Sequence, residues 1–185
     1  MTDPLRIFRK LALMNRLANA RLHRACAALP SGAYEAERPS FFGSIRATLN
    51  HILLVDRFYL NALEGRGLDR ADLEEARNCP DLPQLALWQA QSDDRLIAFV
   101  EGLSPPALER IVTVDRGTRA QHDRCDDLLS HVFQHQTHHR GQAHGLLSMT
   151  PVPPPQLDEF IVGDDAAARA ADMAALGWDE ARLMQ

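Results

Sequence analysis

The sequence predicts an all-α protein, a four-helix bundle with a small β-hairpin before the last bundle helix. Apolar residues recur at helical spacing in four long segments, and proline or glycine stop signals bound each segment. Only residues 111–114 (Ile-Val-Thr-Val) have the composition of a strand. A chain of 185 residues is long enough for one domain with a substantial core.

We expect the first helix over residues 4–29, with Asp3 as its cap and a proline in its first turn. The second is expected over residues 41–63, with Ser40 as its cap. Apolar residues occupy much of its circumference, which indicates burial on several sides. The charged residues 64–81 predict a long loop with about one helical turn.

Asp81 followed by a proline predicts the start of the third helix, which should end near residue 103. A hairpin is expected over residues 109–122. Asp123 is the expected cap of the fourth helix, which should run to about Met149 with two aspartates in its first turn. Beyond a proline-rich break, an alanine-rich helix is expected near residues 165–176.

Composition argues against several classes of protein. The net charge is −5 with no basic block, so neither nucleic acid nor an anionic membrane is an expected partner. There is no apolar run of membrane-spanning length and no signal-peptide pattern. The three cysteines (Cys26, Cys79 and Cys125) are widely spaced and fit reduced cytosolic thiols. We therefore expect a cytoplasmic protein.

Four of the eight histidines fall in residues 131–139, within the expected fourth helix. His135 and His139 lie four residues apart, so a helix places both imidazoles on one face within reach of one metal ion. His131 is one turn further back on nearly the same face, and His138 is rotated by about 100°. Two ligands from one helix require at least one more from elsewhere.

His51 is the best candidate for that third ligand. Taken alone, a histidine in an apolar helix is more often a hydrogen-bonded structural residue. Next to His135 and His139, it would complete a three-nitrogen site for a divalent metal. Zinc or nickel suits imidazole ligands best, and iron, cobalt or manganese also fits. A structural zinc site more usually has four protein ligands, so an open site of this kind suits catalysis.

Other polar residues receive weaker assignments. We expect His23 to be a half-exposed polar residue, and His131 to be structural or an orienting partner of a ligand. His138 and Arg140 are expected to face solvent or a dimer interface. Asp56 either supports a ligand or faces the surface. Cys125, at the start of the fourth helix, is expected to be an ordinary buried thiol.

Two segments carry a resemblance to a known family. Residues 49–56 (Leu-Asn-His-Ile-Leu-Leu-Val-Asp) and 131–142 resemble the two signature segments of the DinB/YfiT-like putative metalloenzymes. The resemblance spans roughly residues 5–162, and Tyr59 departs from it, because the family often has tryptophan there. It implies an up-down-down-up bundle over residues 1–162, and we expect residues 163–185 to be a helical tail packed on the same domain.

The resemblance also implies a function and partners. It implies a divalent metal on His51, His135 and His139, and usually a homodimer. Relatives include thiol-dependent transferases and isomerases that use low-molecular-weight bacterial thiols. The first hypothesis is therefore a metal-dependent thiol transferase or hydrolase acting on a small molecule, with no further catalytic residue assigned. The alternative is a non-catalytic stress-response metal-binding bundle or a dimeric interaction module.

Overall fold

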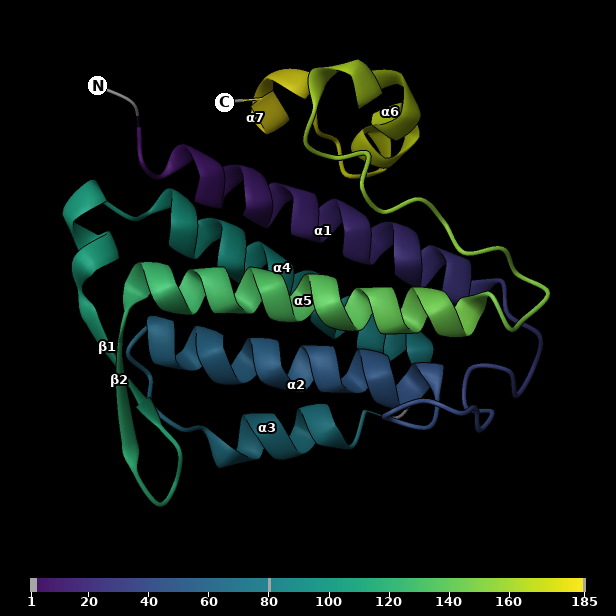
Figure 1. Ribbon diagram of the computed structural model, residues 1–185, viewed down its shortest axis with the longest axis horizontal. Helices are drawn as coiled ribbons and strands as arrows, with labels where there is room; N and C mark the ends of the chain where they lie inside the picture. The colour runs from purple at the N-terminus through teal and green to yellow at the C-terminus, as the bar shows by residue number, and fades with distance from the viewer. Residues whose placement is uncertain (1–2, 80, 185) are drawn as a thin grey trace.

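Four long helices form a bundle in the computed structural model, which describes residues 3–79 and 81–184. They are α1 (Arg6–Ala27), α2 (Ile45–Leu63), α4 (Leu82–Glu101) and α5 (Cys125–Leu147). Figure 1 shows α1 and α5 running in one direction and α2 and α4 in the other. This is the expected up-down-down-up order, so the predicted fold class is confirmed.

The remaining elements are short. They are α3 (Arg70–Arg77), the 3₁₀ turns η1 (Pro105–Glu109) and η2 (Gly163–Asp165), the strands β1 (Ile111–Asp115) and β2 (Ala120–Arg124), and the helices α6 (Ala166–Ala175) and α7 (Glu180–Met184). The two strands form the expected hairpin before α5, antiparallel and in register from Ile111 opposite Arg124.

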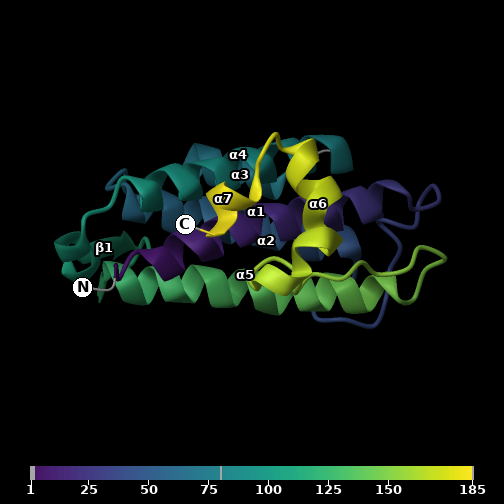
Figure 2. The same ribbon diagram turned by 90° about the horizontal axis from the view of Figure 1, so that it is seen from above.

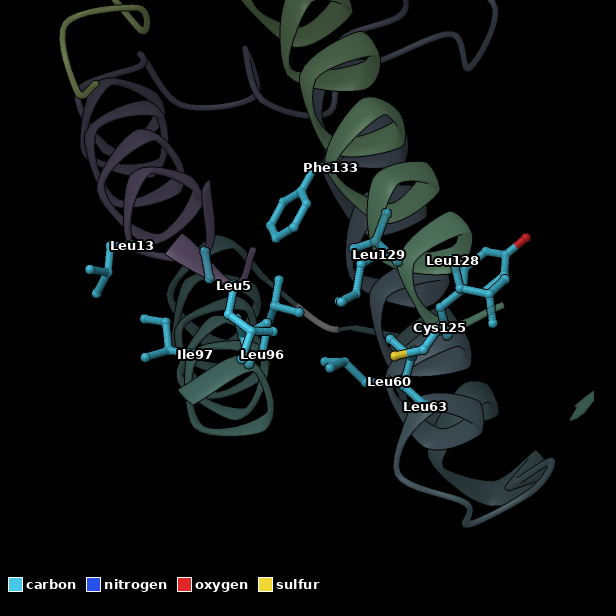
Figure 3. Packing of buried hydrophobic residues seen from close by; sticks show 14 of the residues in the cluster. Leu5, Leu13, Leu60, Leu63, Leu96, Ile97, Cys125, Leu128, Leu129 and Phe133 are labelled. Carbon is cyan, nitrogen blue, oxygen red and sulfur yellow. The ribbon is translucent and has the colours of Figure 1, made fainter. Parts of the chain in front are cut away.

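Each bundle helix packs against two others. Both α1 and α2 contact α4 and α5, so α2 and α5 lie side by side along much of their length. Leucines from all four helices fill the interior (Figure 3), among them Leu13, Leu60, Leu96 and Leu129. Burying one such side chain contributes about 1.5–3 kcal/mol, so this core supplies the main force that holds α2 against α5.

Helix starts agree with the sequence at one place and differ at three. α1 begins at Arg6 with Leu5 at its cap position, so the prediction that Asp3 caps it was wrong. Asp81 caps α4 as expected, accepting from the backbone N–H of Gln84 at 2.9 Å. α2 begins four residues later than expected, because Gly43 has a φ of 80° that an α-helix cannot contain. Ser44 is its cap, and the prediction of Ser40 was wrong. Asp123 does not cap α5 either, because it belongs to β2 and pairs with Val112 of β1.

The segment between α2 and α4 contains more helix than expected. α3 is an eight-residue helix capped by Asp69, where the sequence predicted about one turn. Arg57 holds it on α2 by donating to Asp72 Oδ1 at 2.8 Å and to Glu75 Oε2 at 3.0 Å. These ion pairs are tertiary contacts, which local sequence pattern does not reveal.

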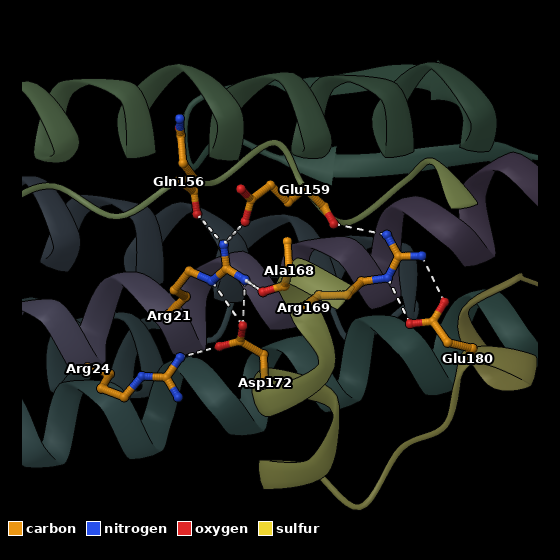
Figure 4. A network of polar contacts seen from close by, with 8 residues as sticks. All are labelled: Arg21, Arg24, Gln156, Glu159, Ala168, Arg169, Asp172 and Glu180. Carbon is orange, nitrogen blue, oxygen red and sulfur yellow. Dashed lines mark hydrogen bonds and ion pairs between the residues drawn. The ribbon is translucent and has the colours of Figure 1, made fainter. Parts of the chain in front are cut away.

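The C-terminal segment packs on α1, on the side turned away from α2 (Figures 1 and 2). Arg21 of α1 donates to Asp172 Oδ2 at 3.0 Å and to Glu159 Oε2 at 2.6 Å. Arg169 is fully buried and forms two hydrogen bonds with Glu180, at 2.9 and 2.8 Å (Figure 4). Charged pairs of this kind fix α6 and α7 on the bundle. No described helix is both long and apolar enough to cross a membrane.

Candidate metal centre

The contact between α2 and α5 brings three histidines together. His51 of α2 meets His135 and His139 of α5, and one ring nitrogen of each lies within 4.8 Å of the other two. The Nε2 atoms of His51 and His135 are 3.0 Å apart. The ring centroids of His135 and His139 are 4.3 Å apart, as expected for residues one helical turn apart.

These positions fit a divalent metal. Imidazole nitrogens bind zinc at about 2.0–2.1 Å, so two nitrogens on one ion lie roughly 3 Å apart. The observed 3.0 Å between His51 and His135 matches that separation. It also suits a hydrogen bond between one protonated and one bare nitrogen. Three neutral nitrogen donors would leave the full charge of a dication to act on whatever else it binds.

The protonation of the three rings favours metal binding. Burial, followed by the neighbouring rings, lowers the pKa of His135 to about 3. Burial is also the largest cause of the lowered pKa of His51 and of His139. A metal competes with protons for the same lone pairs, so rings that are neutral at pH 7 are ready ligands.

Neighbouring side chains orient the rings. His139 Nδ1 donates to Gln142 Oε1 at 2.7 Å, and because that oxygen can only accept, the proton is on Nδ1 and the lone pair on Nε2. Phe42, in the loop before α2, stacks on His51 at 4.4 Å between ring centroids. Its ring also meets the His139 ring edge to face at 5.3 Å. The phenyl ring therefore shields two of the three imidazoles on one side.

The other histidines lie outside this group. His131 is exposed, with its ring centroid 6.1 Å from that of His135 and 4.9 Å from that of Tyr59. His138 is exposed and contacts Gln142. His23 was expected to be half-exposed, and this was wrong: it is only 7% exposed, because α4 packs against α1. Its burial lowers its pKa to about 4.

Two further expectations concern α5. Arg140 was expected at the surface or at a dimer interface, but it is 4% exposed within the bundle. Its Nη1 donates to Asn19 Oδ1 at 3.1 Å and to Gln136 Oε1 at 3.0 Å, so internal amides stabilise the buried charge. Cys125 is fully buried as expected, and burial raises the pKa of its thiol.

Sequence reasoning missed a buried polar network beside the histidines. Gln89 donates to Asp56 Oδ2 at 2.7 Å and to Asp93 Oδ1 at 3.1 Å. Asn19 also donates to Asp93, at 2.9 Å. Burial raises the pKa of Asp56, with the Asp93 charge as the next cause, and raises the pKa of Asp93 to about 7.

A signal for this network was present in the sequence. Polar residues four apart interrupt the apolar positions of three helices, namely Asn15 and Asn19, Gln89 and Asp93, and Gln136 and Arg140. Gln136 and Arg140 each follow a clustered histidine by one residue, which is about 100° around the helix. By holding these two side chains inside the bundle, the network fixes the rotation of α5 that presents His135 and His139 to α2.

Two cavities are relevant to ligand binding. One of about 380 Å³ is bordered by His135, His131 and Tyr59 and by residues of α3 and the hairpin. A larger one of about 600 Å³ lies between α1 and α4, where His23 and Asp93 line it. None of the three clustered histidines borders the larger cavity, so the smaller one is the candidate substrate site.

The sequence model of the DinB family matches residues 1–169. The chain belongs to the DinB family. Protein DinB of Bacillus subtilis (strain 168) is 26% identical over 146 residues, which cover 75% of this chain and 83% of that protein. The crystal structure of a DinB-like protein from Bacillus subtilis matches with a TM-score of 0.56 and 17% identity, covering 79% of this chain and 95% of that one. The latter likeness supports the DinB-like fold, and the family resemblance seen in the sequence is confirmed.

Proposed function

We propose that this DinB-family protein is a divalent-metal-dependent enzyme, a thiol-dependent transferase or a hydrolase. The observation that carries the proposal is the convergence of His51, His135 and His139 from two helices beside a cavity of about 380 Å³. All three have lowered pKa values and are available as neutral ligands. Zinc or nickel suits these ligands best, with iron, cobalt or manganese as further candidates.

Each residue of the site has a defined part in this proposal. The three imidazoles hold the metal, Gln142 fixes the tautomer of His139, and Phe42 shields one side of the cluster. A bound dication would lower the pKa of a thiol or water towards neutrality, which makes either a nucleophile at pH 7. His131 and Tyr59 also border the cavity through which a substrate would approach, and both carry polar groups that a substrate could contact.

A turnover assay tests this proposal. The metal-loaded protein should accelerate the reaction of a small thiol, such as cysteine, with an electrophile such as monobromobimane. A chelator should abolish the acceleration, and zinc or nickel should restore it. If fully loaded protein shows no activity across a panel of thiols and activated esters, the enzyme proposal fails.

One observation favours the alternative, a non-catalytic metal-binding bundle of the stress response or an interaction module. Among the residues that the structure describes, no carboxylate borders the cavity beside His135, so the commonest partner for general acid–base chemistry after histidine is missing there. This alternative predicts that metal stabilises the fold without any turnover. The same loaded sample, assayed for both properties, separates the two functions.

We further propose that two copies associate and that the protein acts in the cytoplasm. Leu11 of α1 and Phe133 and Thr137 of α5 line a shallow surface depression, which supports a second copy packing there. All three cysteines are free, which suits a reducing compartment. Sedimentation that shows only monomer at micromolar concentration would refute the dimer.

A further inference from the structure

The cavity beside His135 has an unbalanced charge. Two arginines border it, Arg77 from α3 and Arg116 from the turn of the hairpin. No carboxylate lines it within residues 3–79 and 81–184. The residues that could hold a metal are neutral imidazoles, so they do not offset this positive charge.

Arg116 is held in place from two sides. Its Nη2 donates to the hydroxyl of Tyr59 at 2.7 Å, and its Nε donates to Gln121 Oε1 at 2.8 Å. The guanidinium carbon lies 5.0 Å from the ring centroid of Phe58 and 5.4 Å from that of Tyr59. Cation–π contacts and two neutral hydrogen bonds orient this side chain while leaving its charge unpaired.

The two carboxylates of the hairpin are engaged elsewhere. Asp115 Oδ1 accepts from the backbone N–H of Gly117 at 2.7 Å, and Asp123 Oδ2 accepts from Gln121 Nε2 at 2.5 Å. Arg116 forms no ion pair with any described residue, and its Nη1 makes no hydrogen bond in that part of the chain. Arg77 has a partner, Glu74 at 3.3 Å, but both side chains are more than 60% exposed, so that pair is weak.

Much of the remaining lining of the cavity is apolar. Leu54, Val55 and Phe58 of α2 and Leu73 of α3 border it. A row of aromatic rings then leads from Arg116 to the histidine cluster. The Tyr59 ring lies 4.9 Å from the His131 ring, and the His131 ring lies 6.1 Å from the His135 ring.

We propose that this cavity binds a small organic anion, a carboxylate with an apolar body. The carboxylate pairs with the guanidinium of Arg116, which presents a planar fork of N–H donors to it. The apolar body lies against Val55, Phe58 and Leu73, and the far end of the molecule reaches His135. Calling this anion a substrate rests on the proposed enzyme function, whereas its binding does not require a metal.

A pair of probes that differ only in charge tests the site. Phenylacetate and its neutral amide, phenylacetamide, have nearly the same shape, and their affinities can be measured by ligand-observed NMR on protein stripped of metal with a chelator. Phenylacetate should bind at least about tenfold more tightly, the effect of one charge-assisted hydrogen bond. Arg116→Gln should remove that preference by weakening phenylacetate about tenfold and leaving phenylacetamide unchanged.

Arg119→Gln is the matched control, because Arg119 is an exposed arginine of the same hairpin that does not border the cavity. This substitution should leave the preference for phenylacetate intact. Circular dichroism should show that both variants are as fully folded as the wild type. Equal affinities for the two probes, equal effects of the two substitutions, or no binding of either probe at about 10 mM would each overturn the anion site.

The outcome for the anion site is separable from that for the enzyme. If the stripped protein prefers phenylacetate but no metal binds to the histidines, the enzyme proposal fails and the anion site stands. If metal binds and thiol turnover occurs while the charge preference is absent, the enzyme proposal stands and the substrate class proposed here is wrong.

Discussion

The Nε2 atoms of His51 and His135 lie 3.0 Å apart, although 84 residues separate the two histidines along the chain. The first belongs to α2 and the second to α5, and neither helix alone holds the whole cluster. A metal bound there would connect these two helices across their contact. Its affinity and the stability of the bundle are therefore coupled.

His51 should matter to metal binding as much as the pair on α5. Replacing His51 by Ala should weaken metal affinity by at least about 100-fold, as should His139→Ala, since each removes one of three nitrogen donors. His23→Ala is the control, because His23 is buried on α1 and lines the other cavity. Metal content after dialysis, measured by plasma mass spectrometry, gives the result. Full loading of the His51 variant would rule out the three-histidine site.

Gln142 should tune the metal affinity without binding the metal. Gln142→Ala removes the acceptor that holds the proton on His139 Nδ1, and the loss should weaken affinity about 10- to 100-fold. Gln134→Ala, at an exposed position of the same helix, should have no effect. Competition with a chromophoric chelator measures both affinities. Equal affinities in the two variants would show that Gln142 has no orienting role.

Metal removal should lower thermal stability. A ligand that binds only the native state at about 100 times its Kd stabilises that state by about 2.7 kcal/mol. Calorimetry of the loaded protein with and without a chelator should show a matching fall in Tm. The same experiment on His51→Ala should show a much smaller change, because its weaker affinity leaves that variant largely without metal. An unchanged Tm in the loaded wild type would mean that metal does not stabilise the fold.

Metal affinity should depend little on pH above the ordinary histidine pKa of 6.5. Burial lowers the pKa of all three ligands, that of His135 to about 3. Protons therefore begin to compete with the metal only below the ordinary histidine pKa of 6.5. Affinity measured from neutral to acid pH should stay level and then fall. A steep fall already above pH 6.5 would contradict the neutral state assigned to the rings.

The buried carboxyl of Asp93 should shape the pH dependence of stability. Burial raises its pKa from 3.8 to about 7, so the native state keeps a proton that the unfolded state releases between those values. This contribution is fully present below pH 3.8 and is lost as the pH rises to about 7, at about 1.4 kcal/mol per pH unit. Asp93→Asn should remove that component of the slope.

Urea unfolding at several pH values between those limits measures the effect. The free energy of unfolding of the wild type, relative to Asp93→Asn, should fall as the pH rises. Asp94→Asn is the matched control, because Asp94 is the adjacent carboxylate and is 63% exposed. A wild type and an Asp93 variant with parallel pH profiles would show that Asp93 does not titrate in this range.

The sequence by itself determined the four bundle helices, the hairpin and the identity of the three clustered histidines. The four-residue spacing of His135 and His139 fixes their common face, and the apolar surroundings of His51 indicate that it is buried. These inferences depend on helical periodicity, which acts over a few residues and can be followed in one chain. The family signature around residues 131–142 added the expected order of the helices.

Only the tertiary structure decided which polar residues enter the core and what surrounds the cluster. Arg140, Asp56 and Asp93 are linked inside the bundle because α1, α4 and α5 supply amide side chains that hydrogen-bond to them. Arg116 reaches the cavity beside His135 because the hairpin packs against α2. Such pairings depend on the rotation and offset of whole helices, and interactions between residues distant in the chain set both.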